Sequence, residues 1–296
     1  MSKRKIRLIA VIMLLAGIAA AGIGRYGMKG DLSELDTREI ATREVRPETG
    51  FDTVYVKGST ANVDLYLSED GTSRVKLTED KEHQFRVRTE NGTLYIEQDE
   101  DPTSLLGVME LKETCVDVYL PEQVWRSLDV SLSTGDCRMD APLCFENAAV
   151  KTTTGDISLC ADIGRISASA TTGDITLKGM KPENAVLSTT TGDIRLMDLS
   201  TGGRISCKAT TGSVKLTNCL AGGIALETST GDITLTDCDA ELLELTATTG
   251  DISGTLLSGK QFDARSATGD IQCPPNDGTG TCRVTTSTGD IRITVK

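Results

Sequence analysis

One tripeptide, Thr-Gly-Asp, recurs through the C-terminal half of the chain at an almost constant interval. Successive glycines of this motif are separated by 20, 18, 19, 20, 19, 19, 19 and 20 residues. A period this constant is typical of repeat proteins, in which each repeat is one unit stacked on its neighbours. The nine glycines are Gly135, Gly155, Gly173, Gly192, Gly212, Gly231, Gly250, Gly269 and Gly289. The repeat therefore constrains the fold more strongly than any other feature of the sequence.

Apolar residues flank each glycine at alternating positions. Ile194 and Leu196 stand two and four residues after Gly192, and Leu187 and Ala185 stand five and seven residues before it. Period-two alternation is typical of half-buried strands, so each repeat is predicted to hold two short strands. The parity of the apolar positions breaks at the glycine, and the chain must therefore turn a corner there. Glycine supplies the backbone angles that such a corner requires.

The repeat length favours a parallel solenoid. Repeats of about 19 residues are too short for a strand-helix-strand crossover, and no segment of the repeats has helical spacing. We expect an all-β fold in which residues 128–296 form a parallel β-solenoid (β-helix) of about nine ~19-residue coils, each stacked on the preceding one. An antiparallel meander is the alternative, but it predicts mirrored hairpin halves, and these repeats are not mirrored.

Residues 1–30 have the composition of a membrane anchor or signal segment. An apolar run covers residues 8–24, which is near the minimum length of a membrane-spanning helix. It is preceded by four basic residues, Lys3, Arg4, Lys5 and Arg7. The basic flank is expected to stay in the cytoplasm, which places the rest of the chain outside. The three alanines at 19–21 suit a signal-peptide cleavage site, so a retained transmembrane helix and a cleaved signal both remain open.

Two further regions separate this segment from the repeats. Residues 31–48 are charged and lack a sustained apolar period, so we expect a stalk linker. Residues 49–127 show alternating runs such as 51–56 and 63–67, with turn signals at Asp70-Gly71 and Asn91-Gly92. We interpret 49–127 as an irregular N-terminal β cap, because an open solenoid end exposes unpaired strand edges.

Together these features resemble a known bacterial family. An N-terminal anchor, a strand-rich head, the step Val118-Tyr119-Leu120-Pro121 and serial Thr-Thr-Gly-Asp-Ile repeats are similar to the DUF4097 family. The resemblance covers roughly residues 50–296. It implies a β-solenoid at the cell surface, a role as an adhesin or as an accessory protein of Gram-positive envelope-stress operons, and no enzymatic activity. The family has no established catalytic residues to carry over.

An aspartate follows the glycine in eight of the nine repeats, and Ser213 takes its place in the ninth. Stacked carboxylates would lie about 5 Å apart, which a ladder of calcium ions would relieve. Calcium-binding β-rolls have nonapeptides with two glycines before the aspartate, and those are absent. We therefore interpret each aspartate as a cap that accepts N–H bonds at its own corner. The eight are Asp136, Asp156, Asp174, Asp193, Asp232, Asp251, Asp270 and Asp290.

A threonine precedes the glycine in all nine repeats. Regular threonine arrays on flat solenoid faces bind ice, but a single column at a corner is not a flat face. We interpret the column as a hydroxyl ladder that suits the stacking of β-branched side chains. Its members are Thr134, Thr154, Thr172, Thr191, Thr211, Thr230, Thr249, Thr268 and Thr288.

The nine cysteines admit two interpretations. Cys219 and Cys238 are 19 residues apart in one apolar row, which permits a disulfide between neighbouring coils without requiring one. Four others occupy positions predicted to face inward, where a thiol behaves as a small apolar group: Cys137, Cys207, Cys273 and Cys282. Paired C-x-x-C clusters are absent, so no zinc or other metal site is expected. Buried thiols and at least one disulfide both remain open.

Catalytic residues are not expected. His83, the single histidine, lies in the charged stretch 80–83 and is interpreted as solvated, and no Ser-His-Asp or Cys-His constellation can be built from the repeats. The alternative is a β-helix enzyme that cleaves polysaccharide with carboxylates alone. Such an active site would break the repeat pattern, whereas these carboxylates follow it. We expect no enzymatic activity and no cofactor.

The sequence thus predicts a non-enzymatic, single-pass protein of the cell membrane whose extracytoplasmic solenoid presents a surface for adhesion or envelope interaction. The expected partners are a cell-envelope polymer or other surface and membrane proteins, and the membrane itself through residues 8–24. An envelope-stress accessory or scaffold protein is the alternative. A formal charge of −12 argues against nucleic acid, because phosphate binding requires clustered Lys and Arg.

Overall fold

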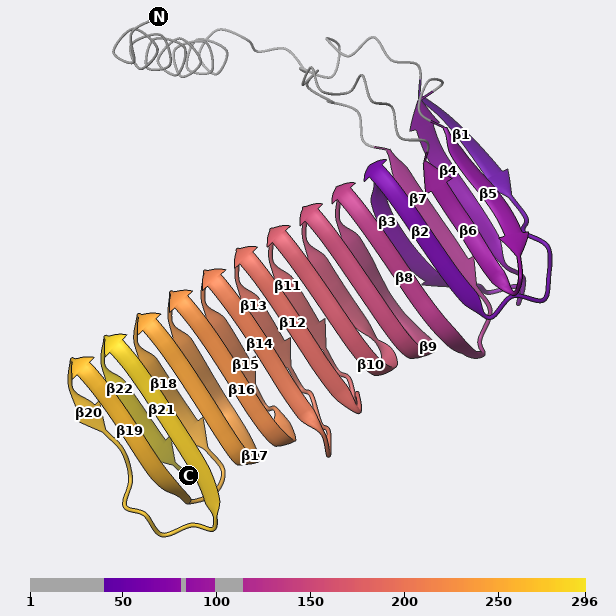
Figure 1. The fold of residues 1–296 in the computed structure, drawn as a ribbon. Helices are drawn as coiled ribbons and strands as arrows, with labels where there is room; N and C mark the ends of the chain where they lie inside the picture. The colour runs from indigo at the N-terminus through magenta and orange to yellow at the C-terminus, as the bar shows by residue number, and fades with distance from the viewer. Residues whose placement is uncertain (1–39, 81–83, 99–113) are drawn as a thin grey trace, which may run out of the picture. The chain divides into compact units, whose positions relative to one another are not determined.

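Twenty-two strands wind around a continuous apolar core in the residues that the computed structural model describes, which are 40–80, 84–98 and 114–296 (Figure 1). All of these strands join one hydrogen-bonded sheet. Within the described ranges, no helix is long and apolar enough to cross a membrane. The expected membrane segment at 1–30, residues 31–39 of the expected stalk, and His83 lie outside them.

The strands fall into an N-terminal group and a repeat group. The N-terminal strands are β1 (Ile40–Val45), β2 (Thr53–Thr60), β3 (Asn62–Leu67), β4 (Arg74–Asp80), β5 (Phe85–Glu90), β6 (Thr93–Gln98) and β7 (Cys115–Leu120). The repeat strands begin with β8 (Val124–Thr134), β9 (Cys137–Thr154), β10 (Ile157–Thr172), β11 (Ile175–Lys178), β12 (Asn184–Thr191), β13 (Ile194–Met197), β14 (Arg204–Thr211) and β15 (Val214–Thr217). They continue with β16 (Leu220–Thr230), β17 (Ile233–Thr249), β18 (Ile252–Leu256), β19 (Lys260–Thr268), β20 (Ile271–Gln272), β21 (Gly280–Thr288) and β22 (Ile291–Val295).

Neighbouring coils pair in parallel and in register, which confirms the β-solenoid. Leu187 lies opposite Cys207 and Ile194 lies opposite Val214, on the two sides of the Gly192 corner. The same register continues through the repeats, and the nine glycine corners delimit about eight turns. A meander would have produced antiparallel pairs between repeats, so that alternative is wrong.

The corner glycines adopt a conformation that other residues avoid. All nine have φ between 139° and 147°. At Gly231 a Cβ atom would lie 2.2 Å from the carbonyl oxygen of Gly212 in the adjacent coil. Both the backbone angle and this contact exclude a side chain, so glycine is required at these nine corners.

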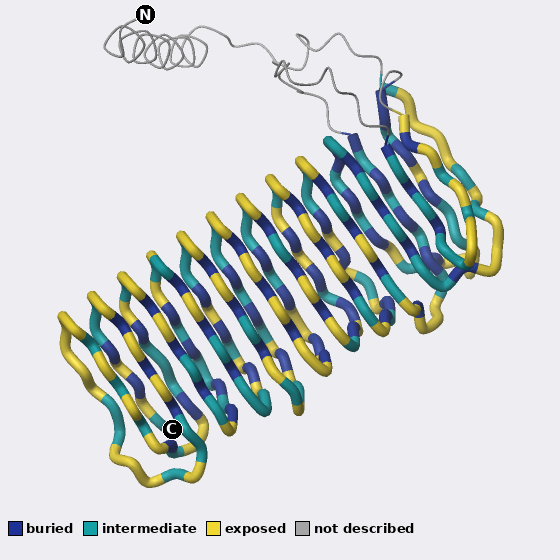
Figure 2. Tube along the Cα trace, viewed as in Figure 1, coloured by how far each residue is buried: buried dark blue, intermediate teal, exposed yellow. Residues whose placement is uncertain are grey.

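The predicted alternation is visible along the coils, where buried and exposed positions succeed one another (Figure 2). Ile194, Val214 and Ile233 form one fully buried column, each with 0% exposure. The apolar row of Cys219 and Cys238 does not continue to Leu257, which stands 19 residues after Cys238. Leu257 is 42% exposed, and Leu256 takes the place opposite Cys238 because the register shifts in that turn.

Coil geometry begins well before the first Thr-Gly-Asp motif. Strands β2 and β3 pair in parallel with β8 and β9, and Thr60 lies opposite Thr134. Ala61 and Asn62 therefore occupy the corner that Gly135 and Asp136 occupy in the next coil. This coil lies inside the segment 49–127 for which the sequence predicts an irregular cap.

The N-terminal end of the stack is closed by antiparallel strands. Strands β6 and β7 form a further parallel layer outside β2 and β3. Strand β5 pairs antiparallel with β6, and β4 pairs antiparallel with β7. Strand β1 pairs antiparallel with β4, so residues 40–45, expected to belong to a stalk, are part of this closure. The predicted need for a closed end is met by these strands.

The order of the coils departs from the order of the sequence at the C-terminal end. Strand β21 pairs with both β17 and β19, and β22 pairs with both β18 and β20. The coil of Gly289 thus lies between the coils of Gly250 and Gly269, and the expectation that each coil stacks on its predecessor is wrong here. The N-terminal end is arranged similarly, since β2 lies between β6 and β8.

A buried ion pair spans the inserted coil. Lys260, whose side chain is 5% exposed, places its Nζ 2.5 Å from Oδ1 of Asp239, two coils away. It passes over Gly280, where a Cβ would lie 3.0 Å from Lys260 Cδ. The absence of a side chain at Gly280 therefore allows the outermost coil to be tied to the coil beyond its neighbour.

The order of the coils predicts which of two isoleucines is sensitive to mutation. Ile291 is 0% exposed between Ile252 and Ile271, whereas Ile271 is 47% exposed on the outermost coil. Ile291→Asp should cost several kcal/mol, because it buries a carboxylate without a partner, and Ile271→Asp should cost about 1 kcal/mol or less. Urea unfolding of the two variants measures this difference. The reverse ranking would indicate that the coils follow the order of the sequence.

Candidate functional site

The Thr-Gly-Asp corner carries two adjacent columns of exposed side chains, which we call the corner surface. The nine threonines that precede the glycines are all exposed, and each lies opposite the threonine of the adjacent coil, as Thr172 does with Thr191. The second column stands one residue earlier and consists of Ser133, Thr153, Thr171, Thr190, Thr210, Ser229, Thr248, Ala267 and Ser287, of which only Ser229 is half-buried. The predicted hydroxyl ladder is therefore present and solvent-accessible.

The aspartate column binds backbone amides, but not those of its own corners. The Oδ1 atom of Asp174 accepts the N–H of Asp193 in the next coil at 2.7 Å, and Asp156 accepts the N–H of Asp174 at 2.8 Å. The prediction that the aspartates accept backbone N–H groups is confirmed. The prediction that each aspartate caps its own corner is wrong, because the amide belongs to the next coil. Because the acceptor belongs to one coil and the donor to another, the aspartates hold neighbouring coils together.

The column also shows how substitutions are accommodated. Asn62 Oδ1 accepts the amide of Asp136 at 2.9 Å, so the series begins in the first coil without an aspartate. Ser213 Oγ accepts the amide of Asp232 at 3.3 Å, which maintains the series where the motif lacks a carboxylate. An oxygen acceptor, rather than a negative charge, is therefore the feature that every corner supplies.

Arginine side chains offset the repulsion between stacked carboxylates. Arg195 lies 2.6 Å from Asp174 Oδ2 and 2.6 Å from Asp193 Oδ2, so one guanidinium bridges two coils. Arg292 pairs at 2.6 Å with Asp290 of its own coil. Across the described part of the chain, no group of three or more His, Cys, Asp or Glu side chains is arranged to hold a metal ion. Seven of the eight repeat aspartates thus accept the corner amide of an adjacent coil.

Two of these carboxyl groups have lowered pKa values. Burial alone would raise the pKa of Asp174, but the amide of Asp193 and the guanidinium of Arg195 outweigh it and lower the pKa below 3.8. The amide of Asp270 is the main cause of the lowered pKa of Asp290, with Arg292 adding to it. Both groups are ionised at neutral pH and bind their partners most strongly in that form.

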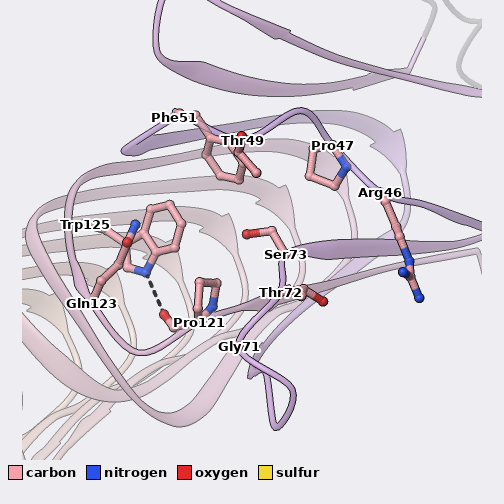
Figure 3. Close-up of a pocket in the computed structure, with 11 residues that line it drawn as sticks. Arg46, Pro47, Thr49, Phe51, Gly71, Thr72, Ser73, Pro121, Gln123 and Trp125 are labelled. Carbon is pink, nitrogen blue, oxygen red and sulfur yellow. Dashed lines mark hydrogen bonds between the residues drawn. The ribbon is translucent and has the colours of Figure 1, made fainter.

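A cavity of about 350 Å³ opens at the N-terminal end of the solenoid, and no sequence pattern predicts it (Figure 3). Three turns build it, at residues 46–51, 71–73 and 121–125. Phe51 and Trp125 pack with their ring centroids 5.3 Å apart, and the Trp125 indole N–H donates to the carbonyl of Pro121 at 3.4 Å. Arg46 supplies the charge in a lining that is otherwise uncharged, which suits binding rather than acid–base catalysis.

A second hollow, of about 510 Å³, follows the turns on the other side of the coils. Leu220, which is 40% exposed, and Ala240 contribute its apolar part. Asp239 and Lys260 also line it, but they neutralise one another through their ion pair. Glu241 is the remaining carboxylate of its lining, so the hollow does not bring two unpaired carboxylates together.

None of the nine cysteines, all of which lie in the described residues, is joined in a disulfide. Cys219 and Cys238 are fully buried in neighbouring coils, and each thiol donates to a nearby carbonyl, that of Thr217 at 3.4 Å and that of Thr236 at 3.3 Å. Burial raises the pKa of Cys137 to about 12. A thiol with so high a pKa is not a nucleophile at neutral pH, so Cys137 serves as a core residue.

The aspartate column predicts how stability responds to mutation and to acid. Asp174→Ala removes the acceptor for the Asp193 amide and should cost about 1–3 kcal/mol, whereas Asp174→Asn keeps an acceptor oxygen and should cost less. Because folding lowers the pKa of Asp174, its stabilising contribution is complete at neutral pH and is lost as the pH falls below about 4.

Urea unfolding at pH 7 and pH 3 measures both effects. The wild-type chain should lose more stability on acidification than Asp174→Asn does. Added calcium and a chelator serve as the control, and neither should change the midpoint at pH 7. Equal costs for the alanine and asparagine variants would contradict the cap, and a chelator-sensitive midpoint would indicate a metal ladder.

Solved structures of bacterial proteins share this fold. A candidate adhesin from Parabacteroides distasonis superposes with a TM-score of 0.58 at 9% identity, covering 87% of this chain and 98% of that one. A candidate adhesin from Bacteroides fragilis gives 0.50 at 13% identity, covering 88% and 98%. A candidate lipid-binding protein from Parabacteroides distasonis gives 0.50 at 14% identity, covering 86% and 96%. At these identities the likeness establishes the fold alone.

Sequence comparison identifies the family. Among curated proteins, none matches the chain. The family model described as Toastrack DUF4097 matches residues 52–206 and 203–296, which together make up most of the chain. The resemblance carried by the Thr-Gly-Asp repeats and the step at 118–121 is thereby confirmed, and the chain belongs to the Toastrack DUF4097 family.

Proposed function

We propose that this protein is a non-enzymatic adhesion or envelope-interaction protein whose corner surface binds an extended, uncharged envelope polymer. The observation that carries the proposal is the column of nine exposed threonines, in register from coil to coil. Adjacent members are about 4.8 Å apart, which is the spacing of paired strands. The column therefore repeats one donor-acceptor group at constant spacing along the stack.

A repeated hydroxyl suits a ligand that is itself a repeat. Each threonine hydroxyl both donates and accepts a hydrogen bond, as the hydroxyl groups of a glycan do. Single contacts of this kind are weak, but a polymer that engages several coils at once gains affinity from their number. The threonines are already held in place by the sheet, so little conformational entropy is lost when the ligand binds.

Charge narrows the class of polymer. The aspartate column runs beside the threonines, and the chain as a whole has a formal charge of −12. A polyanionic polymer would be repelled from this surface, and a neutral or cationic polymer would not. A neutral glycan therefore fits the corner surface better than a phosphate-rich polymer does.

The remaining observations fit a binding protein better than an enzyme. In the described residues, repeat carboxylates such as Asp174 bind backbone amides and arginines. Two of the solved structures that share the fold are named as candidate adhesins, which supports the proposal by analogy. Residues 8–24 would hold the solenoid at the outer face of the cell membrane.

Binding of the full-length chain to purified, neutral wall glycan tests the proposal. The triple variant Thr172→Val, Thr191→Val and Thr211→Val removes three adjacent hydroxyls while keeping β-branched side chains. We expect it to lower the affinity at least tenfold, because contacts along the polymer act together. Co-sedimentation with insoluble glycan measures the affinity.

The matched control changes the same side chain away from the corner. Thr217, Thr236 and Thr255 are half-buried outward residues of the strands that leave the corner. Their triple valine variant should bind glycan as the wild-type chain does. Equal binding by both triple variants would contradict the role of the corner surface. Capture of membrane proteins by a chain that does not bind glycan would favour the scaffold alternative.

A further inference from the structure

The two ends of the solenoid differ in whether their outermost strand edges are covered. Antiparallel strands close the N-terminal end, whereas β19 and β20 form the outermost coil at the other end (Figure 1). β19 pairs with β21 alone, and among the described strands none pairs with its other edge. An open edge of this kind presents unpaired N–H and C=O groups to any strand that approaches it.

The side chains of the outermost coil are covered on one side only. Phe262 and Ala264 of β19 are half-buried, whereas Cys282 and Val284, which lie opposite them in β21, are fully buried. Ile271 is 47% exposed, and the isoleucine opposite it, Ile291, is 0% exposed. The apolar core of the solenoid therefore continues up to this end of the stack.

The hydrogen-bonding groups of the edge are partly occupied. Asn276 Oδ1 accepts the amide of Phe262 at 2.7 Å, which shows that the Phe262 amide faces the open side. Alternate residues of a strand present their amides to the same side, so the amides of Ala264 and Ser266 also face outward. The loop that carries Asn276 thus covers the beginning of the edge and leaves its centre open.

The charges of the edge strand match a second copy of the same strand. Asp263 and Arg265 are exposed on the outer face of β19, on either side of Ala264. An antiparallel, two-fold pairing centred on Ala264 places Asp263 of each copy opposite Arg265 of the other. Centring on Asp263 or Arg265 would instead place like charges opposite one another, which is unfavourable in a sheet.

We propose that the open edge of β19 pairs with the β19 edge of a second copy of this chain, forming a two-fold dimer through the C-terminal ends of the two stacks. The outward amides and carbonyls around Ala264 form the new hydrogen bonds, and the two Asp263–Arg265 pairs fix the register. The consequence rests on the proposed function. If two chains are attached to two separate surfaces, such a dimer links those surfaces.

Charge reversal tests the pairing separately from glycan binding. The full-length chain, kept in detergent without glycan, is studied by analytical ultracentrifugation over a range of concentrations. We expect the wild-type chain to form dimers. Arg265→Asp alone and Asp263→Arg alone should each weaken dimerisation at least tenfold, because like charges then face one another. Lys215→Asp, an exposed position in a coil away from this edge, is the control and should dimerise as the wild type does.

Mixing the two charge-reversal variants gives the decisive result. An equimolar mixture of Arg265→Asp with Asp263→Arg restores both opposite-charge pairs across the interface, so heterodimers should form where neither variant dimerises alone. The pairing of these residues within one strand cannot produce that rescue. A monomeric wild-type chain at high concentration, a dimer unaffected by the single reversals, or a mixture that stays monomeric would each overturn the proposal, whatever the outcome for glycan.

Discussion

Each coil of this solenoid is fixed at its corner by groups that only a neighbouring coil supplies. A carboxylate oxygen of one coil accepts the corner amide of the next, as between Asp174 and Asp193 at 2.7 Å. The carbonyl of Gly212 approaches Gly231 so closely that no side chain fits between them. A single repeat therefore lacks the partners that its own corner requires, and stability arises between coils rather than within them.

The same constraint shapes the surface that the protein presents. Because the corner amides require an acceptor from the adjacent coil, the aspartates are committed to the backbone and to arginines such as Arg195. The stacking of the coils does not require the hydroxyl groups of Thr191 and its equivalents, and these side chains remain exposed. The column suited to binding is thus a by-product of a corner built for stacking, which fits a protein that binds along its length rather than at one pocket.

Much of the fold follows from the spacing of the repeats, but the order of the coils does not. A 19-residue period predicts the corner, its glycine and the buried columns. It does not predict which repeat stacks on which, because every repeat has the same pattern. One sequence pattern does indicate the order of the coils. At the position three residues before each glycine, threonine and alanine alternate along the chain from the second repeat until Ala247. Ser266 comes next in the chain, but Thr286 comes next in the stack, and it donates to the Gly250 carbonyl at 3.1 Å. The cavity beside Trp125 escaped prediction because three distant turns build it.

Hydrogen exchange of an Ile233→Asp variant tests most directly whether stability arises between adjacent coils. Ile233 is 0% exposed between Val214 and Ile252, so the buried carboxylate disturbs the contacts of three coils. Amide protection should fall most in the coils of Gly212, Gly231 and Gly250 and should persist in β2 to β7. An equal loss of protection throughout the described chain would mean that one cooperative core, and not coil-to-coil contact, holds this protein together.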